Sequence, residues 1–284
     1  MFKDVGFMGK LGLLFEELAV KLDFSKNRIQ KYRTWVVNAN AARAKDLMDS
    51  KLNQYDKAEE LITFYAFAPL ELREDKKDTI EEILKLANVH ESLEESVSLS
   101  FEKQFKPPTG YLKWLNNEVA NHPINYIRKK GIEHTNRGKR LEANTHVDAV
   151  FESKNLLILV EVKFTSDISY DVTFNPHRNQ LARTIDVGIE EAEKKGKKLV
   201  VLLCTPSEFY HKRSRLYYYK IQEYSDLIKI SQDIEWRLVE DIKTHLLKVA
   251  WLPLEEVIKI VYQNLSLPEL KEAKKFFAER NLIS

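Results

Sequence analysis

The 284-residue chain is poor in the residues that build several common kinds of functional site. Its single cysteine, Cys204, allows neither a disulfide framework nor a cysteine-based zinc site, and it suits a reducing, cytoplasmic location. With only eight glycines, the chain carries no GxxxxGK[ST] phosphate loop and no strand-borne GxGxxG pattern, which argues against a nucleotide-cradling fold. Its longest apolar runs, such as 156–160, are too short to span a membrane.

The formal net charge of +2 hides an uneven distribution of charge along the chain. Residues 71–102 contain ten acidic and four basic residues, whereas residues 103–140 contain nine basic and two acidic residues. Apolar residues make up 44% of the chain, which is enough for a sizeable core. The length suits one large domain or a core with helical attachments, and the basic stretch is a candidate surface for an acidic partner.

The distribution of glycine and proline divides the chain into three regions. Neither residue occurs between Gly12 and Pro69, and apolar residues recur there at helical spacing. The strongest break follows at residues 107–110, where the sequence reads Pro-Pro-Thr-Gly. We therefore expect a helical N-terminal region (1–105), a central region (106–222) and a helical C-terminal region (223–284).

The central region alternates helices and strands in an order typical of an α/β sheet. A short helix is expected over 111–120, and a strand over 140–152 with one apolar and one polar face. Residues 156–164 form a second, buried strand, and an amphipathic helix over 179–195 leads to a third strand over 199–204. The last three elements form a right-handed parallel crossover, so we predict an α/β fold with a mixed sheet flanked by helices.

Three charged residues stand out in the first two of these strands. Glu161 and Lys163 lie two residues apart in the buried strand and so share a face, although burying charge is costly unless it is paired or binds a metal. A tight turn at 154–155 pairs residues whose numbers sum to 309, which sets Asp148 opposite Glu161 with Cβ atoms about 4.5–5.5 Å apart. Carboxylates that close repel unless a cation lies between them, and oxygen ligands favour Mg²⁺.

Asp148, then twelve residues, then Glu161-Val162-Lys163 resembles the PD-(D/E)XK nuclease superfamily, which includes type II restriction endonucleases, Holliday-junction resolvases and RecB-like nucleases. The resemblance covers about residues 111–205, and it implies a restriction-endonuclease-like mixed-sheet core. Asp148 follows Val147, where the family pattern has proline.

The resemblance also implies roles for these residues in hydrolysing DNA phosphodiester bonds. Asp148, Glu161 and the backbone carbonyl of Val162 would hold Mg²⁺, for which Mn²⁺ can substitute, and Lys163 would orient or activate the attacking water. Such a metal polarises the scissile phosphate and stabilises the negative charge that develops on it. The alternative interpretation is a structural Asp–Lys or Glu–Lys pair on a solvated sheet face, which the apolar run before Glu161 disfavours.

Other candidates for the site rest on weaker patterns. Superfamily members often have a further upstream acid, for which we favour Glu142 over Glu118, while His146 shares the strand face of Asp148. Gln180 opens the helix after the motif, as in RecB-like relatives, but Thr184 stands where they have tyrosine.

Two basic stretches flank the acidic residues in sequence, and with one helical arginine they are candidates for binding phosphates. The predicted nucleic-acid-binding residues are Arg128, Lys129, Lys130, Arg137, Lys139, Arg140, Arg183, Lys212, Arg213 and Arg215.

The favoured hypothesis is a cytoplasmic, metal-dependent endodeoxyribonuclease that resembles restriction enzymes and acts on DNA, with a homodimer supplying two sites for a duplex cut. The alternatives are a DNA repair or junction nuclease, a RecB-like nuclease, an RNA-cleaving enzyme, an inactive nucleic-acid-binding protein with the same fold, and a helical protein-interaction module.

Overall fold

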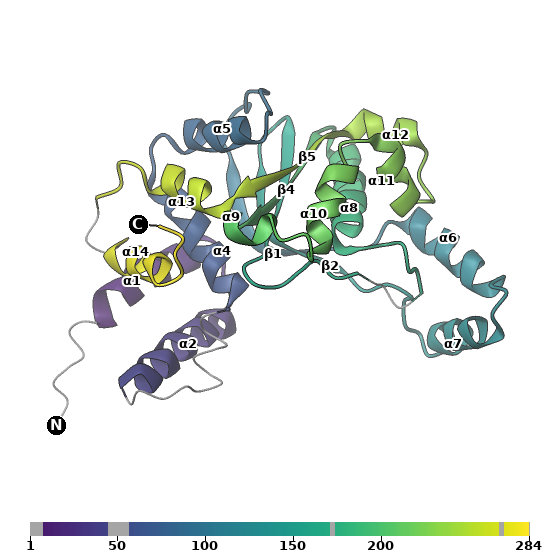
Figure 1. Ribbon diagram of the computed structural model, residues 1–284, viewed down its shortest axis with the longest axis horizontal. Coiled ribbons are helices and arrows are strands. Elements are labelled where there is room, and N and C mark those ends of the chain that lie inside the picture. Colours follow the sequence, from purple (N-terminus) through teal and green to yellow (C-terminus); the bar gives the residue numbers. More distant parts are fainter. Residues whose placement is uncertain (1–7, 45–56, 171–173, 267–269, 284) are drawn as a thin grey trace.

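The computed structural model describes residues 8–44, 57–170, 174–266 and 270–283, and its centre is a mixed five-stranded sheet flanked by helices (Figure 1). The strands, in spatial order, are β1 (Ser98–Phe105), β2 (Thr145–Glu152), β3 (Leu156–Val162), β4 (Lys198–Thr205) and β5 (Leu246–Pro253). The first three form an antiparallel meander, and β4 and β5 continue parallel to β3. The predicted α/β class with a mixed sheet is confirmed.

The pairing of β2 with β3 follows the predicted register, since Ala149 pairs with Val160 and Glu152 with Leu157. Helix α8 (Gln180–Lys195) then crosses from β3 to β4, as expected. The Asn179 side chain accepts a bond from the Ala182 amide at the start of α8, and the helix ends at Gly196, whose φ of 65° suits a residue without a Cβ.

Helices cover both faces of the sheet. One layer contains α1 (Met8–Lys21), α2 (Lys26–Ala44), α4 (Glu59–Phe67), the 3₁₀ helix η1 (Ala68–Leu72), α5 (Lys76–Leu86), α13 (Leu254–Tyr262) and α14 (Lys271–Ala278). The other contains α8, α10 (Leu216–Glu223), α11 (Leu227–Asp233) and α12 (Val239–His245). The short α9 (Ser207–Tyr210) follows β4. No helix among the described residues is long and apolar enough to cross a membrane.

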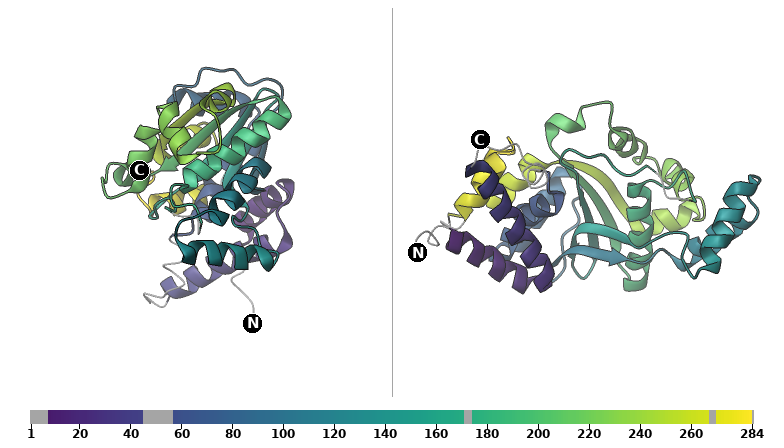
Figure 2. Two further views of the ribbon diagram at one scale, coloured as in Figure 1. Left: turned by 90° about the vertical axis from the view of Figure 1, so that its right-hand side faces the viewer. Right: turned by 90° about the horizontal axis from the view of Figure 1, so that it is seen from below.

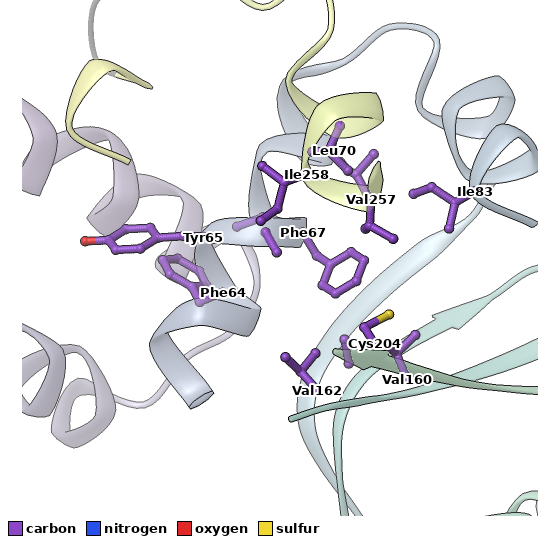
Figure 3. Close-up of a cluster of buried hydrophobic side chains, with 14 of the residues drawn as sticks. Phe64, Tyr65, Phe67, Leu70, Ile83, Val160, Val162, Cys204, Val257 and Ile258 are labelled. Carbon is purple, nitrogen blue, oxygen red and sulfur yellow. The ribbon is translucent and has the colours of Figure 1, made fainter. Parts of the chain in front are cut away.

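The N- and C-terminal helices pack together in one layer. Figure 3 shows Phe67 beside Val257 and Ile258, above the sheet residues Val160 and Cys204. A hydrogen bond joins the two regions as well, because the Tyr262 side-chain hydroxyl donates to the Tyr65 backbone carbonyl at 2.8 Å. The N-terminal helices therefore share one layer, over one face of the sheet, with α13 and α14.

The expectation that both terminal regions are helical is wrong at one strand each. β1 lies within 1–105 and β5 within 223–284. Both are the outermost strands of the sheet, and their short alternating patterns, SLSFEKQF and LLKVAWLP, stand among long helical stretches. Both segments are strands because they pair with β2 and β4. These partners are distant in sequence, so the local pattern of apolar residues does not predict the pairing.

The predicted division of 140–152 into an apolar and a polar face is correct only in part, because alternate residues from Thr145 to Phe151 are buried and His146 is exposed, but Val150 on the polar face is buried too. The strand begins only at Thr145, and helices cover both of its faces. Val147 and Val150 pack with α8, whereas Ala149 and Phe151 pack under the opposite layer.

A helical hairpin, which we call the arm, connects β1 to β2 and projects from one end of the sheet (Figures 1 and 2). It consists of α6 (Thr109–Ala120), close to the predicted 111–120, and of α7 (Asn125–Asn136), which was not predicted as a helix. The two helices approach closely at Gly131, where a Cβ would lie 2.1 Å from Val119 Cγ1.

Because Leu159 is fully buried in the central strand, Leu159→Ala should lower the free energy of unfolding by about 2–5 kcal/mol. Chemical denaturation measures this loss. Leu247→Ala is the matched control, since Leu247 on β5 is 38% exposed and its truncation should cost less than about 0.5 kcal/mol. Equal losses would contradict the assignment of β3 to the centre of the core.

Candidate active site

The predicted Asp148, Glu161 and Lys163 lie together where β2 and β3 meet. Asp148 is the fourth residue of β2, and its Oδ2 accepts a hydrogen bond of 2.7 Å from the Val162 amide of β3. On the other side, the Lys163 amide donates to the Cys204 carbonyl of β4 at 2.9 Å. Both neighbouring strands therefore hold the end of β3.

Helix α8 holds Glu161, whose side chain is 0% exposed. Gln180 Nε2 donates to one carboxylate oxygen at 2.9 Å, and Thr184 Oγ1 donates to the other at 2.8 Å. The two donors are four residues apart and so lie on the same face of the helix. Gln180, one of the predicted site residues, therefore contacts Glu161, and Thr184, which marked a departure from the RecB-like pattern, contacts it too.

Glu59 reaches Lys163 from the opposite layer. It is the first residue of α4, with Oε2 lying 3.5 Å from Lys163 Nζ. Its Oε1 accepts bonds from the Phe164 amide at 3.0 Å and the Ser166 hydroxyl at 2.6 Å. Sequence reasoning missed this residue, although an acidic pair at 59–60 directly before the apolar run LITFYAF was a visible signal of a helix start.

The acidic side chains of the site repel one another. Burial and the Asp148 charge raise the pKa of Glu161 from 4.5 to about 8, against the pull of Lys163. Burial also raises the pKa of Asp148, with Glu59 and Glu60 adding to the rise. Burial alone would lower the pKa of Lys163, but the charges of Glu161, Asp148 and Glu59 raise it, so the ammonium stays charged at neutral pH.

Glu102 on β1 is a further acidic residue that sequence reasoning missed. The ladder pairs Phe101 with Ala149 and Lys103 with Val147, which puts Glu102 beside Asp148. Burial and the Asp148 charge raise the pKa of Glu102 to about 7. Its φ of 50° is strained for a residue with a side chain, and such strain is concentrated at functional sites. The one signal in the sequence was an acid in an alternating strand pattern.

Glu142, which the sequence favoured as a further acid of the site, does not lie with Asp148. It precedes β2 and is 1% exposed, and Arg178 Nε donates to it at 2.9 Å. Arg178 Nη2 is also 2.7 Å from Asp186. Glu142 therefore belongs to a buried ion-pair network. The other candidates, Glu118 on α6 and His146 on β2, are exposed.

The predicted nucleic-acid-binding residues fall into three places. Arg128, Lys129 and Lys130 lie on α7, and Arg137, Lys139 and Arg140 follow it; all six are exposed. Arg183 lies on α8 with its Nε 3.7 Å from Glu142.

The segment with Lys212, Arg213 and Arg215 is tied to the residues that follow β3. Asp167 accepts bonds from the Leu216 amide at 2.6 Å and the Tyr217 amide at 3.2 Å. Lys212 and Arg213 are exposed, so this basic segment lies close to the chain that leaves the candidate site.

The oxygens of Asp148 and Glu161 are ligands of the kind that a hard cation prefers. Among the described residues, no three His, Cys, Asp or Glu side chains form a group that could hold a metal ion. Mg²⁺ does not require such a group, because it is commonly bound through one or two carboxylates and keeps several waters. The two carboxylates are therefore the residues here that could hold such a cation.

No protein-family model, no curated protein and no solved structure matches this chain.

The raised pKa of Glu161 predicts that Glu161→Gln stabilises the protein at alkaline pH. The folded carboxyl ionises near pH 8 and the unfolded one near 4.5, so its contribution to stability is lost as pH rises between these values. Glutamine keeps the volume without the charge, and the Thr184 hydroxyl can accept a bond instead of donating one. We expect the free energy of unfolding at pH 8.5 to rise by about 1 kcal/mol or more, measured by denaturation.

Glu152→Gln is the matched control with the opposite sign. Although burial opposes it, bonds from Lys197 and Lys195 lower the pKa of Glu152 to about 2. Its stabilising contribution is present above pH 4.5 and lost as pH falls toward 2, so the variant should be less stable at pH 8.5. If Glu161→Gln were less stable than the wild type at pH 8.5, the conclusion that the Glu161 and Asp148 carboxylates repel each other would be wrong.

Proposed function

We propose that this protein is a metal-dependent nuclease that hydrolyses phosphodiester bonds of DNA through Asp148, Glu161 and Lys163. The main support for the proposal is that two mutually repelling carboxylates, Asp148 and Glu161, lie with the charged Lys163 at the carboxyl end of β3. Such strongly shifted pKa values in one cluster are typical of functional sites. A structural ion pair would need only one carboxylate per lysine, whereas Lys163 is surrounded by Glu59, Asp148 and Glu161.

The order of elements supports a restriction-endonuclease-like core. An antiparallel meander (β1 to β3) is followed by a crossover helix (α8) and a parallel strand (β4), which is the order that the resemblance implies. Gln180 on the crossover helix contacts the second acid of the motif, which favours a RecB-like member as the second candidate.

The residues fit Mg²⁺ because the site has more acidic charge than its lysine can balance. Asp148 and Glu161 would hold the ion together with the carbonyl of Val162, the residue between Glu161 and Lys163. When bound, Mg²⁺ would polarise the scissile phosphate and stabilise its developing negative charge.

The chain's own residues orient the reacting groups. Lys163 has a raised pKa and carries only donors, so it orients the attacking water and stabilises charge on the phosphate rather than removing a proton. Glu59 anchors the Lys163 ammonium, and Gln180 and Thr184 fix the Glu161 carboxylate. With their positions set by both helical layers, these groups need little reorganisation when substrate binds.

Asp148→Asn and Lys163→Ala should each reduce DNA cleavage with Mg²⁺ by about 10²-fold or more, because each removes charge that acts on the phosphate. The assay uses circular plasmid, linear duplex, single-stranded DNA and RNA, with EDTA as the metal-free arm. Nicking of closed circles indicates an endonuclease, whereas degradation of linear ends alone favours the RecB-like candidate.

Lys154→Ala is the matched control for Lys163→Ala, since Lys154 lies at the exposed β2–β3 turn and pairs with the exposed Glu95 at 3.0 Å. It should cleave at the wild-type rate. Cleavage that resists EDTA, or that persists in Asp148→Asn, would contradict the proposal.

Glu102→Gln should shift the acid limb of the cleavage pH profile downward by about 0.5–1 pH unit. The Glu102 charge helps to raise the pKa of Glu161, so neutralising Glu102 lowers that pKa and lets Glu161 ionise at lower pH. The control is Glu95→Gln in the exposed segment before β1, which should leave the profile unchanged. A profile that moves upward in Glu102→Gln would be inconsistent with repulsion between these acids.

A further inference from the structure

The arm presents one face of α7 away from the rest of the molecule. The opposite face packs on α6 at Gly131, and the His134 ring lies 5.5 Å from the ring of Phe174. A small core containing Tyr111, Leu115 and Val119 anchors α6. The position of α7 is therefore set by its inner face, and its outer face remains available.

Helical spacing defines the residues of this outer face. They are Asn125, Arg128, Lys129, Ile132 and Asn136, all of them exposed. Ile132 is 45% exposed although it is an apolar residue in the middle of a helix. The stripe thus combines two amides, two cations and one aliphatic side chain.

Among the described residues, the basic side chains of α7 form no ion pairs. In the part of the chain that the structure describes, no acidic side chain pairs with Arg128, Lys129 or Lys130, and Arg128 donates only to Asn125. By contrast, Lys195 and Lys197 on the body both bind Glu152. The arm therefore suits a polyanionic partner.

We propose that the outer face of α7 contacts base edges in the major groove of duplex DNA. The choice of DNA as the ligand rests on the proposed function. Arginine pairs with guanine, asparagine pairs with adenine, and aliphatic side chains contact the thymine methyl group. Twelve residues make a helix about 18 Å long, and the major groove, about 12 Å wide, admits an α-helix.

The connection of the arm to the sheet supports this placement. The arm leaves β1 after Phe105 and joins β2 at Thr145, and Asp148 lies three residues into β2, about 10 Å along the strand. Residues 137–144 join α7 to β2, so a duplex held by α7 would leave the arm at the end of the sheet where Asp148 lies. Arg137, Lys139 and Arg140 follow α7 and are exposed, and they would contact phosphates of that duplex.

The same features select DNA over other polyanions. The major groove of A-form RNA is too narrow and deep for side chains to read, so an exposed reading helix does not suit double-stranded RNA. An anionic membrane would require several large apolar side chains on one face, whereas the stripe has Ile132, and the exposed Ile124 and Tyr126 lie off it.

The test uses the full chain carrying Asp148→Asn, in EDTA, so that binding is measured without cleavage. A pool of randomised duplexes first identifies the preferred sequence. Adding Arg128→Ala should weaken binding to that sequence by roughly 5- to 150-fold and leave binding to unrelated duplexes nearly unchanged.

The paired variant Lys139→Ala/Arg140→Ala should weaken binding to every duplex alike and reduce the salt dependence of log K by about 2. Lys154→Ala serves as the surface-charge control and should change neither quantity. Melting curves for all variants confirm that the arm remains folded.

Failure of this inference is distinguishable from failure of the proposed function. Equal weakening of all sequences by Arg128→Ala, absence of sequence preference, or tighter binding to anionic lipid vesicles than to duplex DNA would overturn the reading role, even if the protein cleaves DNA. Sequence-selective binding that depends on Arg128 would support it, even if no substrate is cleaved.

Discussion

Repulsion between buried carboxylates at the end of β3 is the constraint on which the rest of the site depends. Glu161 is fully buried, and the Asp148 charge raises its pKa. Such an arrangement is costly for folding, and it persists only because surrounding groups offset it. Lys163 supplies the compensating charge, while Gln180 and Thr184 donate hydrogen bonds to the Glu161 carboxylate.

The fold supports these groups from both sides of the sheet. α4 brings Glu59 to Lys163 from one layer, and α8 brings its donors to Glu161 from the other. α4 is itself held by the C-terminal helices, through the bond from Tyr262 to the Tyr65 carbonyl. The two terminal regions, which the sequence suggested were attachments, thus help to hold one acid of the site in place.

Residues close together in sequence were the ones whose structure could be predicted. The β2–β3 turn determines the register that brings Asp148 to β3, and the amphipathic pattern of α8 predicts the crossover and the position of Gln180. Glu59 and Glu102 could not be assigned, because α4 and β1 reach the site only through tertiary packing. Glu142 shares the strand spacing of Asp148, but the strand begins after it and Arg178 binds it instead.

The most direct test of the account is the binding of Mn²⁺ at pH 8, measured by electron paramagnetic resonance on the wild type, Asp148→Asn, Glu161→Gln and the control Glu152→Gln. If the repelling carboxylates form a cation site, the wild type and Glu152→Gln bind Mn²⁺ there, whereas Asp148→Asn and Glu161→Gln do not. Binding that is absent from the wild type, or unchanged in Asp148→Asn and Glu161→Gln, would contradict the account.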